Sequence, residues 1–218
     1  MHFFGTIWTN SASKKLSKLE QIELLSRLFC IQENGIFNQN NITDFNERSK
    51  KLLKDKTLDS LAIYKLFLKE ITAEKSANIS CEQTPKNIYY LEEILIYFPE
   101  AKVINMIRDQ RDVLLSQKNK WKRKFLGASA IPFSEAIRSY INYHPILTSK
   151  VWNSALEYTS KFENSDRVMV VKFEKLLSNP QHTIQEISKF IGVDFTEEML
   201  AIPVVGSSTE QDGENDFI

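Results

Sequence analysis

Apolar residues recur at helical spacing through the first third of the chain. In residues 13–35 they repeat every three or four positions, with Ser13 placed to cap the start of a helix and Gly35 to close its end. The same spacing returns in residues 43–55 and 57–74. The pattern therefore predicts three helices in this part of the chain.

Short apolar runs replace this spacing further along and predict strands. They cover residues 78–81, 102–107 and 167–173. Helical patterns separate or follow them, at residues 88–98, 111–121, 134–162 and 180–192. Strands that alternate with helices are typical of parallel pairing through right-handed crossovers. We therefore expect an α/β fold with three parallel strands, whose central sheet contains Cys81, Ile104, Ile107, Val170 and Val171.

The composition is that of an ordinary globular protein. The 218 residues include 42% hydrophobic and 26% charged residues, with 28 basic and 28 acidic side chains. This balance excludes disorder and collagen, and the length predicts a single domain with a buried core. Within that domain we distinguish a helical segment at residues 1–75, a core at 76–206 and an acidic tail at 207–218.

The glycines restrict the class of nucleotide site that the chain can form. There are six glycines, and the closest two, Gly206 and Gly213, are seven positions apart. A Walker A loop or a GxGxxG turn needs closer glycines. A nucleotide kinase would require such a loop. A kinase therefore remains an alternative, although the chain lacks the main sequence motif of that class.

Cys30 and Cys81 are the two cysteines of the chain. Two are too few for a disulfide framework, and neither has the Cys or His neighbours of a zinc site. We therefore expect no metal and a reducing compartment, the cytoplasm. No stretch reaches the roughly 18 apolar residues of a membrane helix, so we expect no membrane partner.

Charge is balanced overall but clustered locally. Residues 102–124 carry eight basic and two acidic side chains, an excess of six. Such a block attracts anions, although a solvated surface is the simpler explanation of a charged run. Residues 118–124 could bind nucleic acid in a noncatalytic protein, which steep salt dependence of DNA or RNA binding would reveal. We do not expect nucleic acid to be the partner.

Polar residues follow two of the predicted strands, at residues 82–86 and 108–112. The second group begins with Arg108 and leads into a predicted helix. A cation at the end of a strand, facing a helix start, can bind a phosphate. Arg–Asp pairs at strand ends also occur as structural ion pairs, so this pattern alone leaves both interpretations open.

Three motifs in this region resemble the signature of sulfotransferases that use 3′-phosphoadenosine 5′-phosphosulfate (PAPS). They are Glu-Gln-Thr-Pro at 82–85, Phe-Pro-Glu-Ala-Lys-Val-Ile at 98–104 and Arg-Asp-Gln-Arg-Asp-Val at 108–113, followed by Ser116. The run at 170–180 is also similar to the family's strand and Asn-Pro segment. The resemblance implies a P-loop-kinase-like parallel sheet flanked by helices, here without its first strand and phosphate loop.

The resemblance implies roles for single residues. Arg108 and Ser116, eight positions apart, match the residues that bind the 3′-phosphate of PAPS. Phe173 stands where relatives often have a tyrosine near the adenine, with packing in the core as the alternative. Gln83 replaces the usual lysine near the transferred sulfuryl group, which removes a positive charge.

The segment His2-Phe3-Phe4 looks like part of the heparan sulfate and glycan branch of this family. His2 is then a candidate substrate-site residue, with an ordinary chain terminus as the alternative. In that branch the catalytic glutamate lies two residues before the histidine. We therefore expect the catalytic base and the phosphate loop to precede Met1, and the chain to be truncated at both ends.

The family transfers a sulfuryl group from PAPS to a hydroxyl or amine without a metal. The resemblance therefore implies PAPS as cosubstrate and a glycan as acceptor, with low activity from this chain alone. Two alternatives remain at this point: a noncatalytic remnant of the family, and a nucleotide kinase of the same fold.

Overall fold

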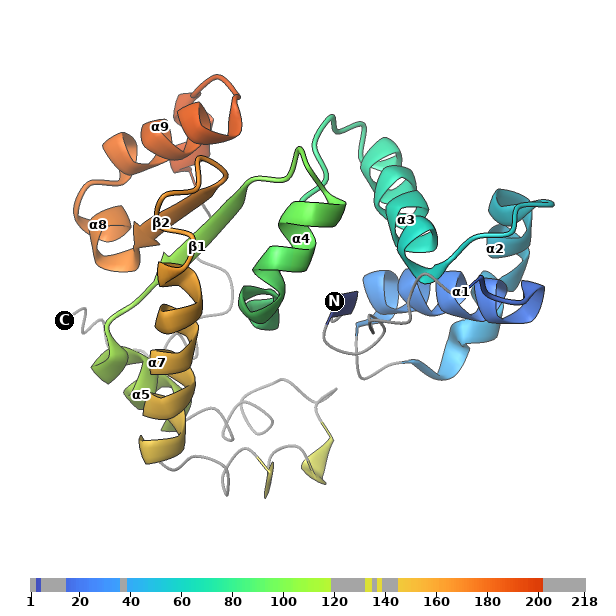
Figure 1. The fold of residues 1–218 in the computed structure, drawn as a ribbon, viewed down its shortest axis with the longest axis horizontal. Coiled ribbons are helices and arrows are strands. Elements are labelled where there is room, and N and C mark those ends of the chain that lie inside the picture. The colour runs from blue at the N-terminus through green and yellow to red at the C-terminus, as the bar shows by residue number, and fades with distance from the viewer. Residues whose placement is uncertain are drawn as a thin grey trace. The chain divides into compact units, whose positions relative to one another are not determined.

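The computed structural model describes residues 3–4, 15–35, 39–118, 132–134, 137–138 and 145–201. The chain divides into two compact units, Met1–Tyr90 and Leu91–Ile218 (Figure 1). The first unit is helical in its described residues, and the second contains a small parallel sheet with helices.

The first unit contains the helices that the apolar spacing predicted. They are α1 (Lys18–Asn34), the 3-10 helix η2 (Gln39–Phe45), α2 (Asn46–Leu53), α3 (Ser60–Glu74) and the 3-10 helix η3 (Pro85–Tyr90). The N-cap of α1 is Ser17, not Ser13, which lies outside the described residues. Ser17 caps the helix because Glu20 lies three residues further on, where the two residues form a capping box. Each side chain accepts a hydrogen bond from the other residue's backbone amide.

The core of the first unit is aromatic. Phe29 and Phe67 join α1 to α3 with ring centres 5.3 Å apart. Phe3 stacks on Tyr64 at 4.0 Å, and Phe4 meets the same tyrosine edge-on at 6.2 Å. All five side chains are almost fully buried, so the Phe-Phe pair near the start of the chain serves packing.

The strand predicted at residues 78–81 is wrong. This segment has no regular secondary structure, its Ile79 is 56% exposed, and Cys81 is exposed. A strand must pair its backbone groups with a neighbour, and no strand in the described part of the chain lies beside these residues. The Ser80 hydroxyl instead hydrogen-bonds to that of Thr72 at the end of α3, at 2.7 Å.

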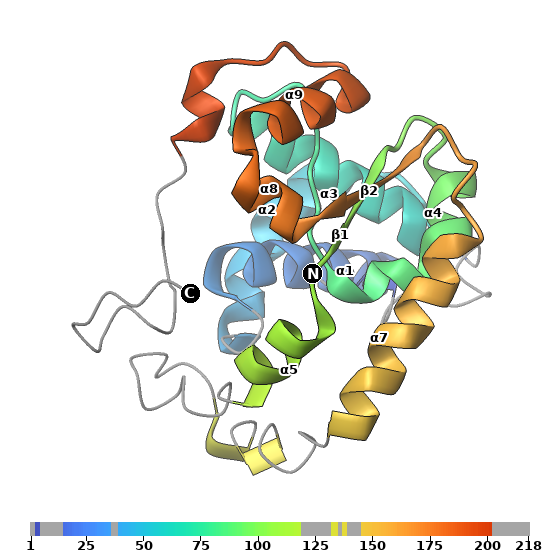
Figure 2. The same cartoon turned by 90° about the vertical axis from the view of Figure 1, so that its left-hand side faces the viewer.

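The second unit confirms the predicted α/β class with parallel strands. Its elements are α4 (Leu91–Tyr97), β1 (Val103–Ile107), α5 (Gln110–Lys118), α7 (Pro145–Ser160), β2 (Val168–Lys172), α8 (Phe173–Ser178), α9 (Pro180–Ile191) and the 3-10 helix η5 (Glu197–Leu200). The two strands pair in parallel, from Val103 opposite Val168 to Ile107 opposite Lys172. Figure 2 shows this pair with α8 and α9 following β2.

Only part of the sheet is buried. Val168 and Val171 of β2 are 9% and 3% exposed, whereas Ile104 of β1 and Val170 of β2 are 38% and 43% exposed. Of the residues expected in the sheet, Ile104, Ile107, Val170 and Val171 lie in it, whereas Cys81 does not. Ile104 and Val170 are nevertheless not core residues. In the described part of the chain each strand has a single neighbour, so each strand has one edge without a partner among those residues.

Basic side chains hold the starts of both strands. The Arg167 guanidinium, before β2, donates to the carbonyls of Leu95 and Pro99 at 2.9 and 2.8 Å. Lys102, before β1, donates through Nζ to the carbonyl of Phe190 near the end of α9, at 2.5 Å. Because these contacts fix the amino ends of the strands, they also fix where the carboxyl ends emerge.

Candidate functional site

The candidate site lies at the carboxyl ends of β1 and β2. Parallel strands end at the same edge of a sheet, and the register places Ile107 opposite Lys172. The next residues are therefore neighbours: Arg108 and Asp109 after β1, and Phe173 and Glu174 at the start of α8. The fold thus brings together two of the residues that the sequence singled out, Arg108 and Phe173.

The Arg108 side chain is partly open to solvent. Its exposed fraction is 42%, and Nη2 lies 3.7 Å from a carboxylate oxygen of Asp112, one helical turn away on α5. On the other side, the guanidinium carbon lies 5.0 Å from the centre of the Phe173 ring. A guanidinium carries five N–H donors. The long ion pair with Asp112 and the contact with the Phe173 ring leave some of these donors able to bind an anion.

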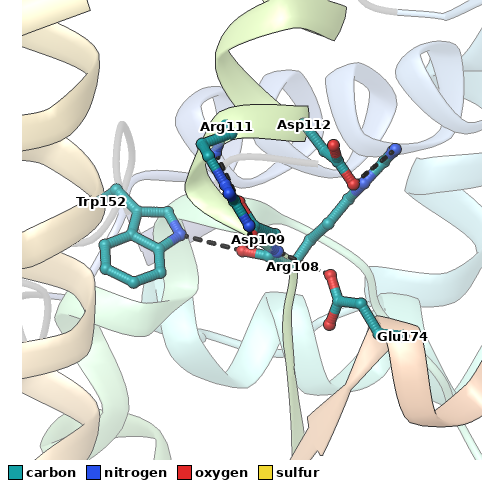
Figure 3. Close-up of polar contacts among 6 residues, drawn as sticks. All are labelled: Arg108, Asp109, Arg111, Asp112, Trp152 and Glu174. Carbon is teal, nitrogen blue, oxygen red and sulfur yellow. Dashed lines mark hydrogen bonds and ion pairs between the residues drawn. The ribbon is translucent and has the colours of Figure 1, made fainter.

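The peptide group between Arg108 and Asp109 is held by two side chains (Figure 3). Its carbonyl oxygen, on Arg108, accepts a hydrogen bond of 3.2 Å from the indole Nε1 of Trp152 on α7. Its N–H, on Asp109, donates to Oε1 of Glu174 on α8 at 2.7 Å. This last hydrogen bond lowers the pKa of the Glu174 carboxyl below its usual value.

Asp109 organises the start of α5. Its Oδ1 accepts from the backbone N–H of Arg111 at 2.8 Å, and its Oδ2 accepts from Nη2 of the same arginine at 2.8 Å. The hydrogen bond from the Arg111 side chain is the main cause that lowers the pKa of Asp109 to about 2. The Arg111 side chain is 89% exposed, so this arginine, in the first turn of α5, pairs locally and faces solvent.

A small pocket adjoins Arg108. It has a volume of about 160 Å³ and lies between residues of β1 and α5, such as Ile107 and Val113, and Trp152 and Leu156 of α7. Ligand pockets usually measure about 300–1,000 Å³. The pocket can therefore hold a fragment of a ligand, while a whole nucleotide would extend over the neighbouring surface.

The structure describes less of the other predicted site residues. Ser116 belongs to α5, eight residues after Arg108, and its side chain lies outside the described part of the structure. Gln83 belongs to the first unit, where it is exposed in the segment before η3. His2 lies outside the described residues, as do residues 119–124 of the basic run.

Beside Gln83, the carboxylate of Glu82 is fixed within the first unit. It accepts hydrogen bonds from the Thr84 hydroxyl at 2.6 Å and the Asn87 side-chain amide at 2.7 Å. Burial of the Tyr64 phenol and the nearby charge of Glu82 raise the pKa of that tyrosine above its usual value. Glu82 therefore orders its own loop, a role that its place in the Glu-Gln-Thr-Pro motif did not reveal.

Sequence reasoning missed two residues of the site, Glu174 and Trp152. Glu174 lay inside the run at 170–180 that resembles the family, and its position two residues after a strand that was predicted to be parallel to the strand before Arg108 was a usable signal. Trp152 gave no such signal, because it lies 44 residues from Arg108 and within an ordinary helical pattern.

The described residues contain no group of three or more His, Cys, Asp or Glu side chains that could hold a metal ion. Among the same residues, no helix has both the length and the apolar character needed to cross a membrane.

Comparisons with known proteins agree on one family. The model of a family described as "Sulfotransferase family" matches residues 14–197. Protein-tyrosine sulfotransferase 1 of Danio rerio is 30% identical over 153 residues, which cover 67% of this chain and 38% of the relative. A putative protein-tyrosine sulfotransferase of Caenorhabditis elegans is 29% identical over 138 residues, covering 62% and 48%.

Cytosolic sulfotransferase 13 of Arabidopsis thaliana is 28% identical over 103 residues, covering 45% of this chain and 31% of the relative. The chain thus spans less than half the length of each of these relatives. Among solved structures, the sulfotransferase domain from the curacin biosynthetic pathway matches with a TM-score of 0.49 and 17% identity. That match covers 81% of this chain and 57% of the other.

Proposed function

Since the chain belongs to the sulfotransferase family, we propose that it binds PAPS and takes part in transferring the sulfuryl group to a hydroxyl or amine acceptor. The observation that carries this proposal is the position of Arg108. It directly follows a parallel strand, lies two residues before the start of α5 and exposes 42% of its side chain. A ligand phosphate at the carboxyl edge of the sheet would lie within reach of that guanidinium.

Arg108 is proposed to bind the 3′-phosphate of PAPS. A guanidinium binds phosphate through two parallel N–H donors, whereas its present partner Asp112 is a carboxylate at 3.7 Å. A dianionic phosphate offers a stronger partner, so it would draw the guanidinium away from Asp112. Ser116 is proposed to add one hydroxyl donor, and Phe173 to lie beside the adenine as well as against Arg108.

The reaction is an in-line displacement at sulfur. The bond between sulfur and the bridging oxygen of the adenosine phosphate breaks, a bond from the acceptor oxygen or nitrogen to sulfur forms, and the acceptor proton passes to a carboxylate base. Cations stabilise the charge that develops on the bridging oxygen. Gln83, where a lysine is usual, supplies no charge there, so we propose a slow transfer step.

The acceptor is proposed on two separate grounds. His2-Phe3-Phe4 resembles a segment of the glycan branch, which favours a carbohydrate hydroxyl. Two of the relatives are named protein-tyrosine sulfotransferases, which favours a tyrosine hydroxyl. Phe3 and Phe4 are buried against Tyr64, so packing alone explains why these two phenylalanines are present. Both classes of acceptor should therefore be tested.

We also propose that the protein acts in a reducing compartment such as the cytoplasm. Cys30 is buried and Cys81 is exposed, and both are thiols. An oxidising compartment would leave the exposed thiol open to modification.

The proposed function is tested in two steps. Calorimetry would compare adenosine 3′,5′-bisphosphate with adenosine 5′-monophosphate, which lacks the 3′-phosphate; we expect the bisphosphate to bind at least about ten-fold more tightly. Transfer of labelled sulfate from PAPS would then be measured with heparan-type glycans and tyrosine peptides. Equal affinity for the two nucleotides would refute the 3′-phosphate site, and label on one acceptor class would identify the acceptor.

A further inference from the structure

We propose that Glu174 and Trp152 are positioning residues for 3′-phosphate recognition, because together they fix the peptide group from which the Arg108 side chain departs. This inference rests on the proposed function, in which Arg108 binds the phosphate. It assigns to both residues a role that acts through the backbone of Arg108.

The geometry of the peptide group carries the inference. The carbonyl of Arg108 and the N–H of Asp109 belong to one planar unit. The first accepts from Trp152 at 3.2 Å and the second donates to Glu174 at 2.7 Å. Because the two hydrogen bonds act on opposite edges of one plane, rotation of that plane would break at least one of them.

The two holding side chains come from separate elements. Trp152 lies on α7, and Glu174 lies in the first turn of α8. Their separations from the peptide along the chain are 44 and 65 residues. The peptide is thus tied to the body of the second unit from two directions, whereas a loop residue is ordinarily held by neighbours in sequence. Figure 3 shows both side chains reaching the same backbone segment.

A fixed peptide plane matters for recognition because Arg108 directly follows the last residue of β1. With the strand on one side and the held plane on the other, the bond from Cα to Cβ of Arg108 keeps one direction. Bidentate binding of a phosphate requires the guanidinium plane to meet two oxygens at once. Arg108 has four side-chain torsions, so a stable starting direction reduces the entropy lost when it binds. The Phe173 ring, 5.0 Å from the guanidinium carbon, limits the side chain on one side.

Asp109 and Asp112 also surround this loop, but neither explains the arrangement. Asp109 directs its carboxylate to Arg111, and Asp112 contacts the Arg108 guanidinium itself. Glu174 is the carboxylate that the structure places on the peptide group, and its charge strengthens the hydrogen bond that it accepts.

The proposed role makes a specific prediction about ligand preference. Loosening the peptide should weaken the gain from the 3′-phosphate while leaving binding of the remaining nucleotide almost unchanged. The readout is therefore the ratio of affinities for adenosine 3′,5′-bisphosphate and adenosine 5′-monophosphate. A general loss of stability would lower both affinities together and leave their ratio unchanged.

The experiment uses the full chain with Glu174→Ala, Glu174→Gln and Trp152→Phe. Glutamine keeps an acceptor oxygen and should preserve most of the ratio, whereas alanine should reduce it about five- to ten-fold. Phenylalanine keeps a ring but lacks the indole donor, so a smaller loss, about two- to five-fold, is expected. Glu186→Ala is the control, since Glu186 is 41% exposed and pairs with Lys175 on the same unit.

Amide hydrogen exchange gives a second readout that needs no ligand. The Asp109 amide should exchange faster in Glu174→Ala than in the wild-type chain or in Glu186→Ala. Unchanged exchange in a folded Glu174→Ala chain would overturn the proposed contact. If Glu174→Ala does not fold, the positioning roles are tested with Trp152→Phe and Glu174→Gln. The readout is then the ratio of their affinities for adenosine 3′,5′-bisphosphate and adenosine 5′-monophosphate.

The outcomes separate this inference from the proposed function. A wild-type chain that binds both nucleotides equally would refute the 3′-phosphate site, and the positioning roles would fall with it. A wild-type chain that prefers the bisphosphate, together with alanine and phenylalanine variants that keep the full preference, would overturn the positioning roles and leave the proposed function intact.

Discussion

The guanidinium carbon of Arg108 lies 5.0 Å from the centre of the Phe173 ring. This contact joins the residue after β1 to the residue after β2, two strands that pair in parallel. A cation over an aromatic face is attracted by the electron-rich ring. The contact therefore supports the arginine in the position where a phosphate is proposed to bind.

Replacing Phe173 with leucine should weaken binding of adenosine 3′,5′-bisphosphate about two- to five-fold, because an exposed cation–ring contact contributes about 0.5–1 kcal/mol. Phe173→Tyr keeps the ring and should bind like the wild-type chain. Isothermal calorimetry would measure both. Equal affinities for the leucine and tyrosine variants would show that the ring contributes neither to Arg108 nor to the adenine.

The Asp109 carboxyl should titrate at unusually low pH. Its pKa is lowered from 3.8 to about 2, mainly by the Arg111 side chain. The folded state therefore favours the ionised form. This contribution to stability is fully present above pH 3.8 and is lost as the pH falls towards about 2.

Carboxyl NMR titration checks this assignment with Arg111→Ala, which should raise the pKa of Asp109 towards 3.8. The Glu186 carboxyl, whose pKa is lowered by Lys175, should titrate identically in both proteins. An Asp109 pKa that does not respond to the loss of Arg111 would contradict the ion pair at the start of α5.

The two central valines of β2 should respond differently to the same change. Val171 is 3% exposed and Val170 is 43% exposed. Threonine has nearly the shape of valine, so Val171→Thr buries a hydroxyl and should lower the free energy of unfolding by about 1–3 kcal/mol. Val170→Thr should change it by less than about 0.5 kcal/mol.

Urea denaturation of both variants gives the comparison directly. Equal losses at the two positions would mean that both faces of β2 are covered, contrary to the exposure of Val170.

Ser116→Ala should weaken binding of adenosine 3′,5′-bisphosphate about two- to ten-fold, because a neutral hydrogen bond contributes about 0.5–1.5 kcal/mol. Affinity for adenosine 5′-monophosphate should not change, since that nucleotide has no 3′-phosphate. Ser160→Ala is a suitable control: this serine ends α7, and its hydroxyl donates to the Glu157 carbonyl. Equal weakening of both nucleotides would place Ser116 outside the 3′-phosphate site.

Much of the architecture could be predicted from local pattern. Apolar spacing placed α1 and α3, and apolar runs placed β1 and β2 together with their parallel pairing. These features depend on residues close in sequence or on the general rule for alternating strands and helices. The position of Arg108 at a strand end followed from the apolar run before it, whereas its proposed role came from the resemblance of the surrounding motifs, because a cation at a strand end can also form a structural ion pair.

The errors arose where distant residues decide the structure. The run at 78–81 contains Ile79 and resembles a strand, but its state depends on whether another strand pairs with it. The hydrogen bonds of Trp152 and Glu174 to one peptide group span 44 and 65 residues. No periodicity or spacing within a single sequence records such contacts, so the structure was needed to find them.

The central claim is that Arg108 recognises the 3′-phosphate of the sulfuryl donor. Calorimetry with adenosine 3′,5′-bisphosphate should compare Arg108→Ala with Arg111→Ala, a neighbouring arginine that is 89% exposed and pairs with Asp109. A charge-assisted hydrogen bond contributes about 1.5–3 kcal/mol, so Arg108→Ala should bind at least about ten-fold more weakly. Arg111→Ala should stay within about two-fold of the wild-type chain. A folded Arg108→Ala chain with wild-type affinity, or equal losses in the two variants, would contradict the assignment.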